Sequence, residues 1–287
     1  MRVGLDIGST TIKCVVLNDA GQIVYSTYER HFSHILEKGR ALLEKVAAEY
    51  LPDGRAYLAI SGSAGMGLAD SCKVPFVQEV FATRVAANRL APGTDCIIEL
   101  GGEDAKILFL TNGTEVRMNG SCAGGTGAFI DEIAALLNVP ADEFEQLAAR
   151  GKTVYSISGR CGVFAKTDIQ PLLIQGAERT DIALSTFHAI AKQTIGGLSQ
   201  GLELTAPIIF EGGPLTFNPT LVRVFAERLH LTEQDIVRPE HPETIVARGT
   251  AIAVDELFPG QQDAITLAQA LERLDHAPAQ PQDAAGT

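Results

Sequence analysis

Short apolar runs separated by turn residues open the chain, and their pattern predicts a small sheet. The runs are Val3–Ile7, Ile12–Leu17 and Gln22–Thr27, with glycine, serine and asparagine between them. Connections this short join antiparallel neighbours. From Ser33 to Tyr50 the apolar residues recur at helical spacing, which predicts an amphipathic helix before a further strand at Tyr57–Ile60.

A second set of runs repeats this order. Asp95–Leu100, Lys106–Leu110 and Thr114–Met118 are typical of strands broken by glycine turns. The repetition predicts a duplication, and therefore two similar α/β halves. The rest of the chain has a mainly helical pattern around one buried strand, Pro207–Phe210. The predicted helices are Ala128–Leu137, Ala141–Arg150, Ala165–Gln175, Ile182–Leu204, Pro219–Leu229 and Thr244–Leu257.

These elements predict two lobes and a tail. We expect residues 1–91 with 243–260 to form the first lobe and residues 92–242 to form the second. From residue 261 the pattern weakens, with a weak helix at Thr266–Leu274. The stretch Ala277–Thr287 is rich in Ala, Pro, Gln and Asp, which predicts disorder.

Composition and charge narrow the class of protein. The 287 residues are 46% hydrophobic and 20% charged, an ordinary globular balance. A net charge of −12 disfavours nucleic acid as a partner. No apolar stretch approaches the roughly 18 residues of a membrane span, so no membrane partner is expected. Asp6 lies where a signal peptide would have its apolar core, and we expect a cytoplasmic protein.

Glycine and cysteine are the two unusual entries in the composition. Glycine accounts for 28 of 287 residues, about 10% against the usual 7% or so. The five cysteines are odd in number, irregularly spaced and without a CxxC pair, which disfavours disulfides and zinc knuckles. Where the glycines cluster, and which cysteines lie beside them, therefore matters more than the totals.

The first glycine turn predicts a phosphate-binding hairpin. It follows the strand that ends at Asp6 and Ile7, and no Walker GxxxxGK[ST] pattern is present. Gly8 permits close approach of the backbone to an anion, Asp6 is a candidate ligand for hydrated Mg²⁺, and Lys13 reaches from the next strand. The candidate phosphate donors are the hydroxyls and N–H groups of Ser9, Thr10 and Thr11. Taken alone, the segment also fits an ordinary hairpin.

Two further loops place glycine pairs beside carboxylates at strand ends. The second loop holds Glu99, a candidate to order Mg²⁺ or the attacking water, and the third precedes a helix and permits close approach of adenosine. Glu103 and Asp104 are alternatives to Glu99 as the catalytic base. The second loop is Glu99-Leu100-Gly101-Gly102-Glu103-Asp104, and the third is Glu211-Gly212-Gly213-Pro214.

These three loops, in this order, resemble the phosphate and adenosine motifs of the acetate and sugar kinase, heat-shock chaperone and actin superfamily. The resemblance implies a two-lobed, actin-like α/β ATPase fold with a nucleotide cleft between duplicated halves. The stretch Ala247-Arg248-Gly249-Thr250-Ala251 resembles the second connecting helix of that fold, whose small residues let the halves approach. Gly249 is therefore included among the expected nucleotide-site residues.

Two cysteines lie in glycine-rich segments that precede predicted helices. Cys122 lies in Gly120-Ser-Cys-Ala-Gly-Gly-Thr-Gly127, and Cys161 lies in Gly159-Arg-Cys-Gly-Val-Phe164. The start of a helix stabilises a thiolate through its free N–H groups and the helix dipole. Two thiolates do not complete an iron–sulfur cubane, but a two-fold dimer supplies four. Buried structural thiols are the other reading, and the commoner one from spacing alone.

The combination of ATPase loops and cysteine motifs resembles the activators of 2-hydroxyacyl-CoA dehydratases and the ATPase subunits of benzoyl-CoA reductases, from about Met1 to Leu257. Activators that stand alone usually read Asp-Ile-Gly-Gly-Gln-Asp where this chain has Glu99-Leu-Gly-Gly-Glu-Asp104. The wording here is more like the N-terminal module of the long multidomain activases. The chain is thus expected to be an excised module or a short relative.

The resemblance implies a function and its cofactors. It implies a homodimer with one [4Fe–4S] cluster held by Cys122 and Cys161 of both subunits, with ATP/ADP and Mg²⁺. ATP hydrolysis would drive low-potential electrons from a ferredoxin or flavodoxin into an acyl-CoA dehydratase or reductase component. Alternatives are a small-molecule, sugar-type kinase of the same fold without a cluster, and a non-enzymatic nucleotide switch. Cys14, Cys96 and Cys72 are expected to be structural, the first two in strands and Cys72 in a polar loop.

Overall fold

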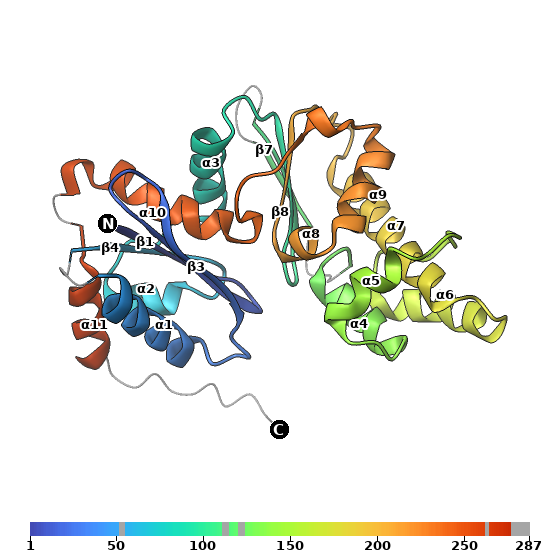
Figure 1. Ribbon diagram of the computed structural model, residues 1–287, viewed down its shortest axis with the longest axis horizontal. Coiled ribbons are helices and arrows are strands. Elements are labelled where there is room, and N and C mark those ends of the chain that lie inside the picture. The colour runs from blue at the N-terminus through green and yellow to red at the C-terminus, as the bar shows by residue number, and fades with distance from the viewer. Residues whose placement is uncertain (52–54, 111–114, 120–123, 262–263, 277–287) are drawn as a thin grey trace. The chain divides into compact units, whose positions relative to one another are not determined.

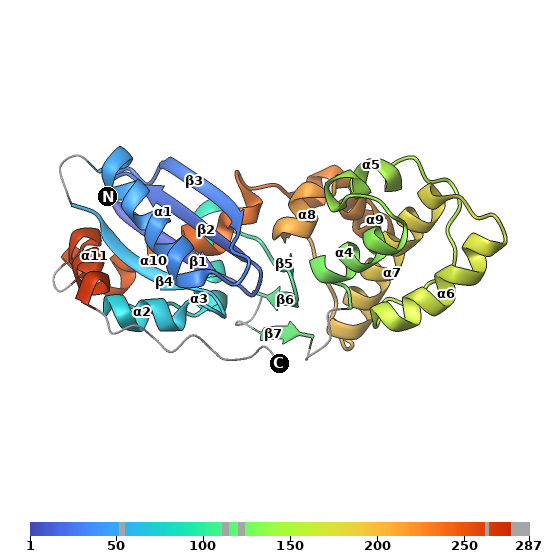
Figure 2. The same cartoon turned by 90° about the horizontal axis from the view of Figure 1, so that it is seen from below.

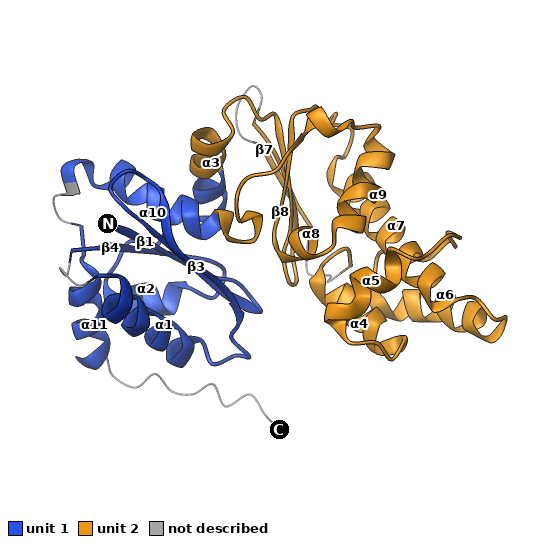
Figure 3. Cartoon of the chain, in the orientation of Figure 1, with its two compact units in different colours: residues 1–83, 246–287 blue, residues 84–245 orange. Residues whose placement is uncertain are grey.

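The computed structural model describes residues 1–51, 55–110, 115–119, 124–261 and 264–276. The predicted tail 277–287 and the start of the strand predicted at Thr114 lie outside these ranges. The chain divides into two compact units, drawn in separate colours in Figure 3. Unit 1 comprises residues 1–83 with 246–287, and unit 2 comprises residues 84–245. Among the described helices, none has both the length and the apolarity needed to cross a membrane.

Unit 1 contains a four-stranded sheet with the order β3-β2-β1-β4. Its strands are β1 (Arg2–Ile7), β2 (Thr11–Leu17), β3 (Ile23–Arg30) and β4 (Tyr57–Ser61). The first three pair antiparallel, as their short connections predicted, and β4 joins β1 in parallel. The parallel pairing brings the carboxyl ends of β1 and β4 to the same edge of the sheet.

Helices cover both faces of this sheet (Figure 1). The helices of unit 1 are α1 (Ile35–Tyr50), α2 (Met66–Cys72), the start of α3 (Glu79–Leu90), most of α10 (Ile245–Leu257) and α11 (Leu267–His276). A 3-10 turn, η4 (Pro259–Gln261), follows α10. Val3, Leu5 and Ile7 pack with residues of α1, α2 and α11, whereas Val15 and Leu17 pack with α10. Alternate strand residues therefore serve two cores, as expected for a sheet buried on both faces.

The sequence patterns missed two helices of this region. Helix α2 begins in a glycine-rich segment that is typical of a turn, and α3 buries small residues such as Ala82 and Ala86 instead of a stripe of large ones. Cys72, predicted in a polar loop, lies instead in α2 and is fully buried, so that prediction was wrong. The weak helix predicted near residue 266 is present as α11, whose Leu267 and Ala270 join the core.

Unit 2 contains a five-stranded sheet with the order β7-β6-β5-β8-β9. Its strands are β5 (Cys96–Leu100), β6 (Ala105–Phe109), β7 (Glu115–Met118), β8 (Ile208–Glu211) and β9 (Ile236–Val237), of which β9 was not predicted. β5, β6 and β7 form an antiparallel meander (Figure 2), and β8 pairs with β5 in parallel. This arrangement repeats that of β1, β2, β3 and β4 and agrees with the predicted duplication.

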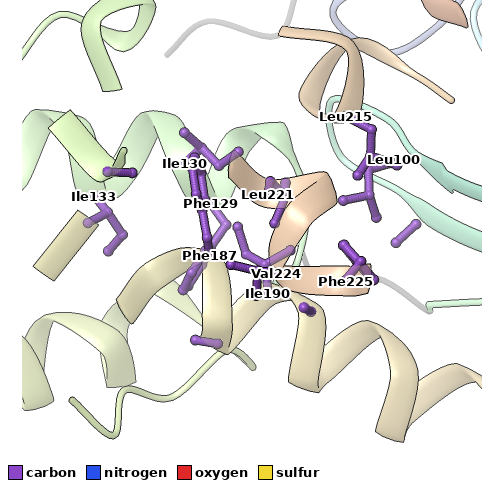
Figure 4. Close-up of a cluster of buried hydrophobic side chains, with 14 of the residues drawn as sticks. Leu100, Phe129, Ile130, Ile133, Phe187, Ile190, Leu215, Leu221, Val224 and Phe225 are labelled. Atoms are coloured by element: carbon purple, nitrogen blue, oxygen red, sulfur yellow. The ribbon is translucent and has the colours of Figure 1, made fainter. Parts of the chain in front are cut away.

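The helices of unit 2 pack around an aromatic core that includes Phe129, Phe187 and Phe225 (Figure 4). They are α4 (Gly127–Leu136), α5 (Phe144–Ala148), α6 (Gly162–Ile174), α7 (Arg179–Leu198), α8 (Gly213–Phe217) and α9 (Pro219–Leu229), with 3-10 turns η1 (Ala141–Glu143), η2 (Glu233–Asp235) and η3 (Pro242–Thr244). The helix predicted from residue 141 to 150 is shorter and begins as η1. Cys96, Ile98 and Leu100 of β5 face this core, so Glu99 faces the opposite side of the sheet.

Candidate nucleotide and cysteine sites

The hairpin between β1 and β2 is closed by a backbone hydrogen bond. The N–H of Gly8 donates to the carbonyl of Thr11 at 2.9 Å and closes the turn. Among the described residues, no backbone oxygen accepts the N–H of Ser9 or Thr10. Both N–H groups are therefore available to an oxyanion, and their role in phosphate binding stays a prediction.

Asp6 and Lys13 form a pair at the base of this hairpin. They are cross-strand partners, and the Lys13 ammonium lies 2.9 Å from the carboxylate of Asp6. The same ammonium lies 3.3 Å from the position that a Cβ atom would occupy on Gly8. The structure thus brings together Asp6, Gly8 and Lys13, which the sequence assigned to magnesium and phosphate binding.

The second loop repeats this arrangement in unit 2. The ammonium of Lys106 lies 3.1 Å from Glu99 and 2.7 Å from Asp104. Glu99 and Lys106 are both buried, whereas Glu103 is exposed at the turn. Leaving a buried carboxylate without its charged partner costs several kcal/mol. The Glu99 carboxylate is therefore held in place beside the Lys106 ammonium. Lys106 was not among the predicted site residues.

The third loop lies beside the second because β8 and β5 are parallel neighbours. Glu211 is buried at 1% exposure and is the register partner of Glu99. Gly212 has φ +91°, and a Cβ atom there would lie 2.1 Å from the Leu100 carbonyl oxygen. The ring of Pro214 packs near the first residue of α4, Gly127. The second and third loops are thus packed against one another within unit 2.

The two units have the same arrangement of a carboxylate, a lysine and a closely packed glycine at corresponding positions. Asp6 and Lys13 are seven residues apart, as are Glu99 and Lys106. After β4, Gly62 has φ +97° and packs on the Ile7 carbonyl, as Gly212 packs on the Leu100 carbonyl after β8. A shared spacing of seven between an acidic strand end and a lysine is the signal that could have identified Lys106.

Gly212 allows a matched test of this close packing. Gly93 has the same φ of +91° but nothing within 4 Å of an added Cβ atom. Gly212→Ala is expected to lower the free energy of unfolding by at least about 3 kcal/mol, since backbone strain adds to a steric clash with the Leu100 carbonyl. Gly93→Ala should cost only the strain, about 1 kcal/mol. Urea denaturation of both variants checks this, and equal losses would contradict the close packing of the loop.

Helix α4 begins on the second loop. The N–H of Gly127 donates to the Gly101 carbonyl at 3.0 Å, and the N–H of Ala128 donates to the Gly102 carbonyl at 2.7 Å. The first N–H groups of a helix have no partner inside the helix, and here the glycine pair of the loop supplies two acceptors. The loop and the first turn of α4 therefore form one hydrogen-bonded unit.

Cys161 is the N-cap residue of α6 and is half-buried. Cys122 itself lies outside the described residues. Nearby, Gly124 is packed so closely that a Cβ atom would lie 2.2 Å from the Arg160 carbonyl oxygen. Gly124, two residues after Cys122 in the sequence, thus contacts the residue before Cys161.

Cys14, Cys72 and Cys96 are buried. Burial raises the pKa of the Cys14 and Cys96 thiols to about 12 and that of Cys72 to about 11. Neutral thiols of this kind neither ligate iron nor react readily. Their expected structural role agrees with this burial.

Gly249 of α10 lies deep in unit 1. A Cβ atom there would lie 1.9 Å from the Ala82 carbonyl oxygen of α3, and Gly4 is packed as closely on the Ala247 carbonyl. These glycines allow α10 to approach both β1 and α3. The contacts account for the small residues of α10 by packing, and a nucleotide role for Gly249 stays a prediction.

Two α/β units with duplicated sheets and glycine loops at corresponding strand ends define an actin-like ATPase fold. The fold is shared with sugar kinases, such as a ROK family glucokinase from Streptomyces griseus (TM-score 0.51, 14% identity, covering 88% of this chain and 98% of that one). Residues 3–252 match the model of the BadF/BadG/BcrA/BcrD ATPase family. The chain belongs to this family and is an ATPase, which confirms the resemblance drawn from its motifs.

Among the family's characterised members, activators of dehydratases are similar over most of the chain. The 2-hydroxyisocaproyl-CoA dehydratase activator of Clostridioides difficile is 29% identical over 273 residues, which is 91% of this chain and 97% of that protein. The solved structure of such an activator from Clostridium difficile, with bound ADPNP, has a TM-score of 0.80 at 28% identity and covers 92% of this chain and 98% of that one.

Proposed function

We propose that this ATPase is a reductive activator. It works as a homodimer that holds one [4Fe–4S] cluster between its subunits and uses ATP to deliver electrons, one at a time, to an acyl-CoA dehydratase or a related reductase. The observation that carries the proposal is the backbone contact between Gly124 and Arg160, which joins the two cysteine segments within one ATPase unit. The similar dehydratase activators support the class of partner.

In this proposal the three glycine loops bind ATP. The N–H groups of Ser9 and Thr10, with Lys13, hold the phosphates, and the Gly212–Gly213 backbone accommodates adenosine. Asp6 and Glu99 hold hydrated Mg²⁺, and Glu99 orients the attacking water. Water attacks the terminal phosphorus, the bond to the bridging oxygen breaks, and ADP and phosphate leave.

The residues near Cys161 fit an iron–sulfur cluster. Cys161 is the N-cap residue of α6, and the start of a helix stabilises a bound group of negative charge through its free N–H groups and dipole. Each subunit offers only Cys122 and Cys161, so four thiolates require two subunits. Two and three residues after Cys161, Val163 and Phe164 are 69% and 63% exposed, an apolar surface suited to a second copy of the chain. When bound, such a cluster accepts and donates single electrons at a potential set by its surroundings.

The hydrogen bonds between the second loop and α4 support coupling of the two sites. A change in the Gly101–Gly102 backbone on ATP binding or hydrolysis moves the Gly127 and Ala128 N–H groups that are bonded to it. Gly124, three residues before α4, carries that movement to the Arg160 backbone and so to Cys161. The protein thereby alters the surroundings of the thiolates in response to nucleotide.

Anaerobic preparation with added iron and sulfide tests the proposal. We expect about four iron and four sulfide per dimer, and an electron paramagnetic resonance spectrum of the reduced protein that changes when ADP is replaced by a non-hydrolysable ATP analogue. A colourless protein that transfers phosphate to an added sugar would show a kinase of the same fold instead. A colourless protein that only changes its partners with nucleotide would show a nucleotide switch, and either result would overturn the proposal.

A further inference from the structure

One buried histidine contacts the phosphate hairpin of unit 1 and has no part in the scheme above. His31 follows directly after β3 and is 2% exposed. Its ring Nε2 lies 2.9 Å from the Gly8 carbonyl oxygen, and its own backbone N–H donates to the Thr10 carbonyl at 3.2 Å. One residue thus contacts two of the four peptide carbonyls in the hairpin turn.

The hydrogen bonds of the ring define its tautomer. The backbone N–H of Ser33 donates to Nδ1 at 3.0 Å, so Nδ1 carries no proton. In the neutral ring Nε2 then carries the proton and donates it to the Gly8 carbonyl. Both ring nitrogens are therefore occupied by the backbone, which leaves the imidazole one orientation.

The segment that makes these bonds is strained. Phe32 and Ser33 have φ values of +50° and +63°, in the left-handed region that residues with a side chain rarely adopt. Phe32 is also 71% exposed, so burial of its ring does not offset the strain. Two consecutive residues in this conformation cost of order 1–3 kcal/mol each, and such strain persists where surrounding contacts enforce it. The bonds made by His31 and Ser33 are contacts of that kind.

The bond to Gly8 has a direct effect on phosphate binding. In a trans peptide the C=O of one residue and the N–H of the next point in opposite directions. A Gly8 carbonyl fixed toward His31 therefore turns the Ser9 N–H away from it, toward the open side of the turn. Donation to the carbonyl also polarises the same peptide and strengthens its N–H as a donor.

We propose that His31 is a positioning residue that holds the Gly8–Thr11 hairpin in its phosphate-binding form. It acts as a neutral donor to the Gly8 carbonyl and aims the Ser9 N–H at a phosphate oxygen of ATP. This inference rests on the proposed phosphate-binding role of the hairpin. It concerns the phosphates only, since adenosine is assigned to the third loop in unit 2.

Three substitutions separate this role from a general effect on folding. His31→Leu removes the donor, and ATP should bind about tenfold more weakly, as for the loss of one hydrogen bond. His31→Gln keeps an N–H near the position of Nε2 and should restore binding to within about threefold of the native protein. The control is His34→Leu, which removes an exposed ring three residues away and should leave ATP affinity unchanged.

Calorimetric titration with ATP and with adenosine gives the decisive readout. Adenosine should bind the native protein and His31→Leu equally, whereas ATP should distinguish them. A native protein that binds ATP no more tightly than adenosine would refute the phosphate site itself. A His31→Leu protein with native ATP affinity, or with equal losses for both ligands, would overturn the role of His31 alone.

A measurement on the native protein covers the case in which His31→Leu does not fold. Nitrogen-15 spectra of labelled histidine distinguish the two neutral tautomers and the cation, and the signals missing from His31→Gln identify His31. We expect the neutral ring protonated at Nε2, with signals that shift on addition of a non-hydrolysable ATP analogue. A ring protonated at Nδ1, or signals that do not respond to the analogue, would overturn the proposal.

Discussion

Cys161→Ala is expected to abolish iron binding, and it is the largest single effect that we predict. Each dimer would keep only its two Cys122 thiolates, whereas a cubane cluster requires four ligands. Alanine also removes the one described cysteine that begins a helix. Iron and acid-labile sulfide, measured after anaerobic reconstitution, should fall from about four of each per dimer to near zero.

The control for this substitution is Cys96→Ala. Cys96 is fully buried in β5, and burial raises its pKa to about 12. Its replacement should leave the iron and sulfide content unchanged, at a modest cost in stability from the small cavity. Full iron content in Cys161→Ala, or its loss in Cys96→Ala, would contradict the proposed ligands. ATP binding by Cys161→Ala verifies that the variant has folded.

Glu99→Gln is expected to reduce ATP turnover by about 10² or more, with ATP still bound. Glutamine has the size of glutamate and can still accept a hydrogen bond from Lys106, but it neither takes up the proton of the attacking water nor attracts a hydrated cation. Loss of a positioned general base typically lowers the rate by 10²–10⁴. Steady-state phosphate release gives the turnover, and equilibrium titration with ATP gives the affinity.

Glu115→Gln provides the same chemical change on the same sheet. Glu115 is an exposed residue of β7 that pairs with Arg117 and lies outside the three glycine loops. Its turnover should equal that of the native protein. Unchanged turnover in Glu99→Gln would remove Glu99 from the mechanism, and Asp104, which shares Lys106 with it, would become the candidate base.

The strand pattern of the fold could be predicted from the sequence because it is locally encoded. The runs around Gly8 and Gly101 alternate with turn residues, and the antiparallel pairing follows from connection length alone. Helices α2 and α3 could not be predicted in this way. One begins in a segment typical of turns, and the other buries small residues that form no apolar stripe.

Site residues could be predicted where a functional side chain or a glycine of unusual backbone conformation lies in one short, recognisable segment. Gly212, with its positive φ, and Asp6, at a strand end, are of this type. Lys106 and His31 were missed because their roles depend on partners in other elements. Lys106 contacts Glu99 on the neighbouring strand, and His31 contacts Gly8 in the turn between β1 and β2. Register and side-chain direction determine such pairs. For Lys106 the sequence holds one indirect signal, the spacing of seven that Glu99 and Lys106 share with Asp6 and Lys13.

The bonds from Gly127 and Ala128 to the Gly101–Gly102 carbonyls have a thermodynamic consequence. If they transmit a nucleotide signal to the cysteine segments, they transmit the reverse signal with equal strength, because coupling between two binding sites is reciprocal. If ATP, compared with ADP, favours reduction of a cluster at the cysteines tenfold, then reduction must raise the affinity for ATP relative to ADP by the same factor of ten. Nucleotide affinity, measured with the protein oxidised and reduced, therefore reports the coupling free energy without any partner enzyme.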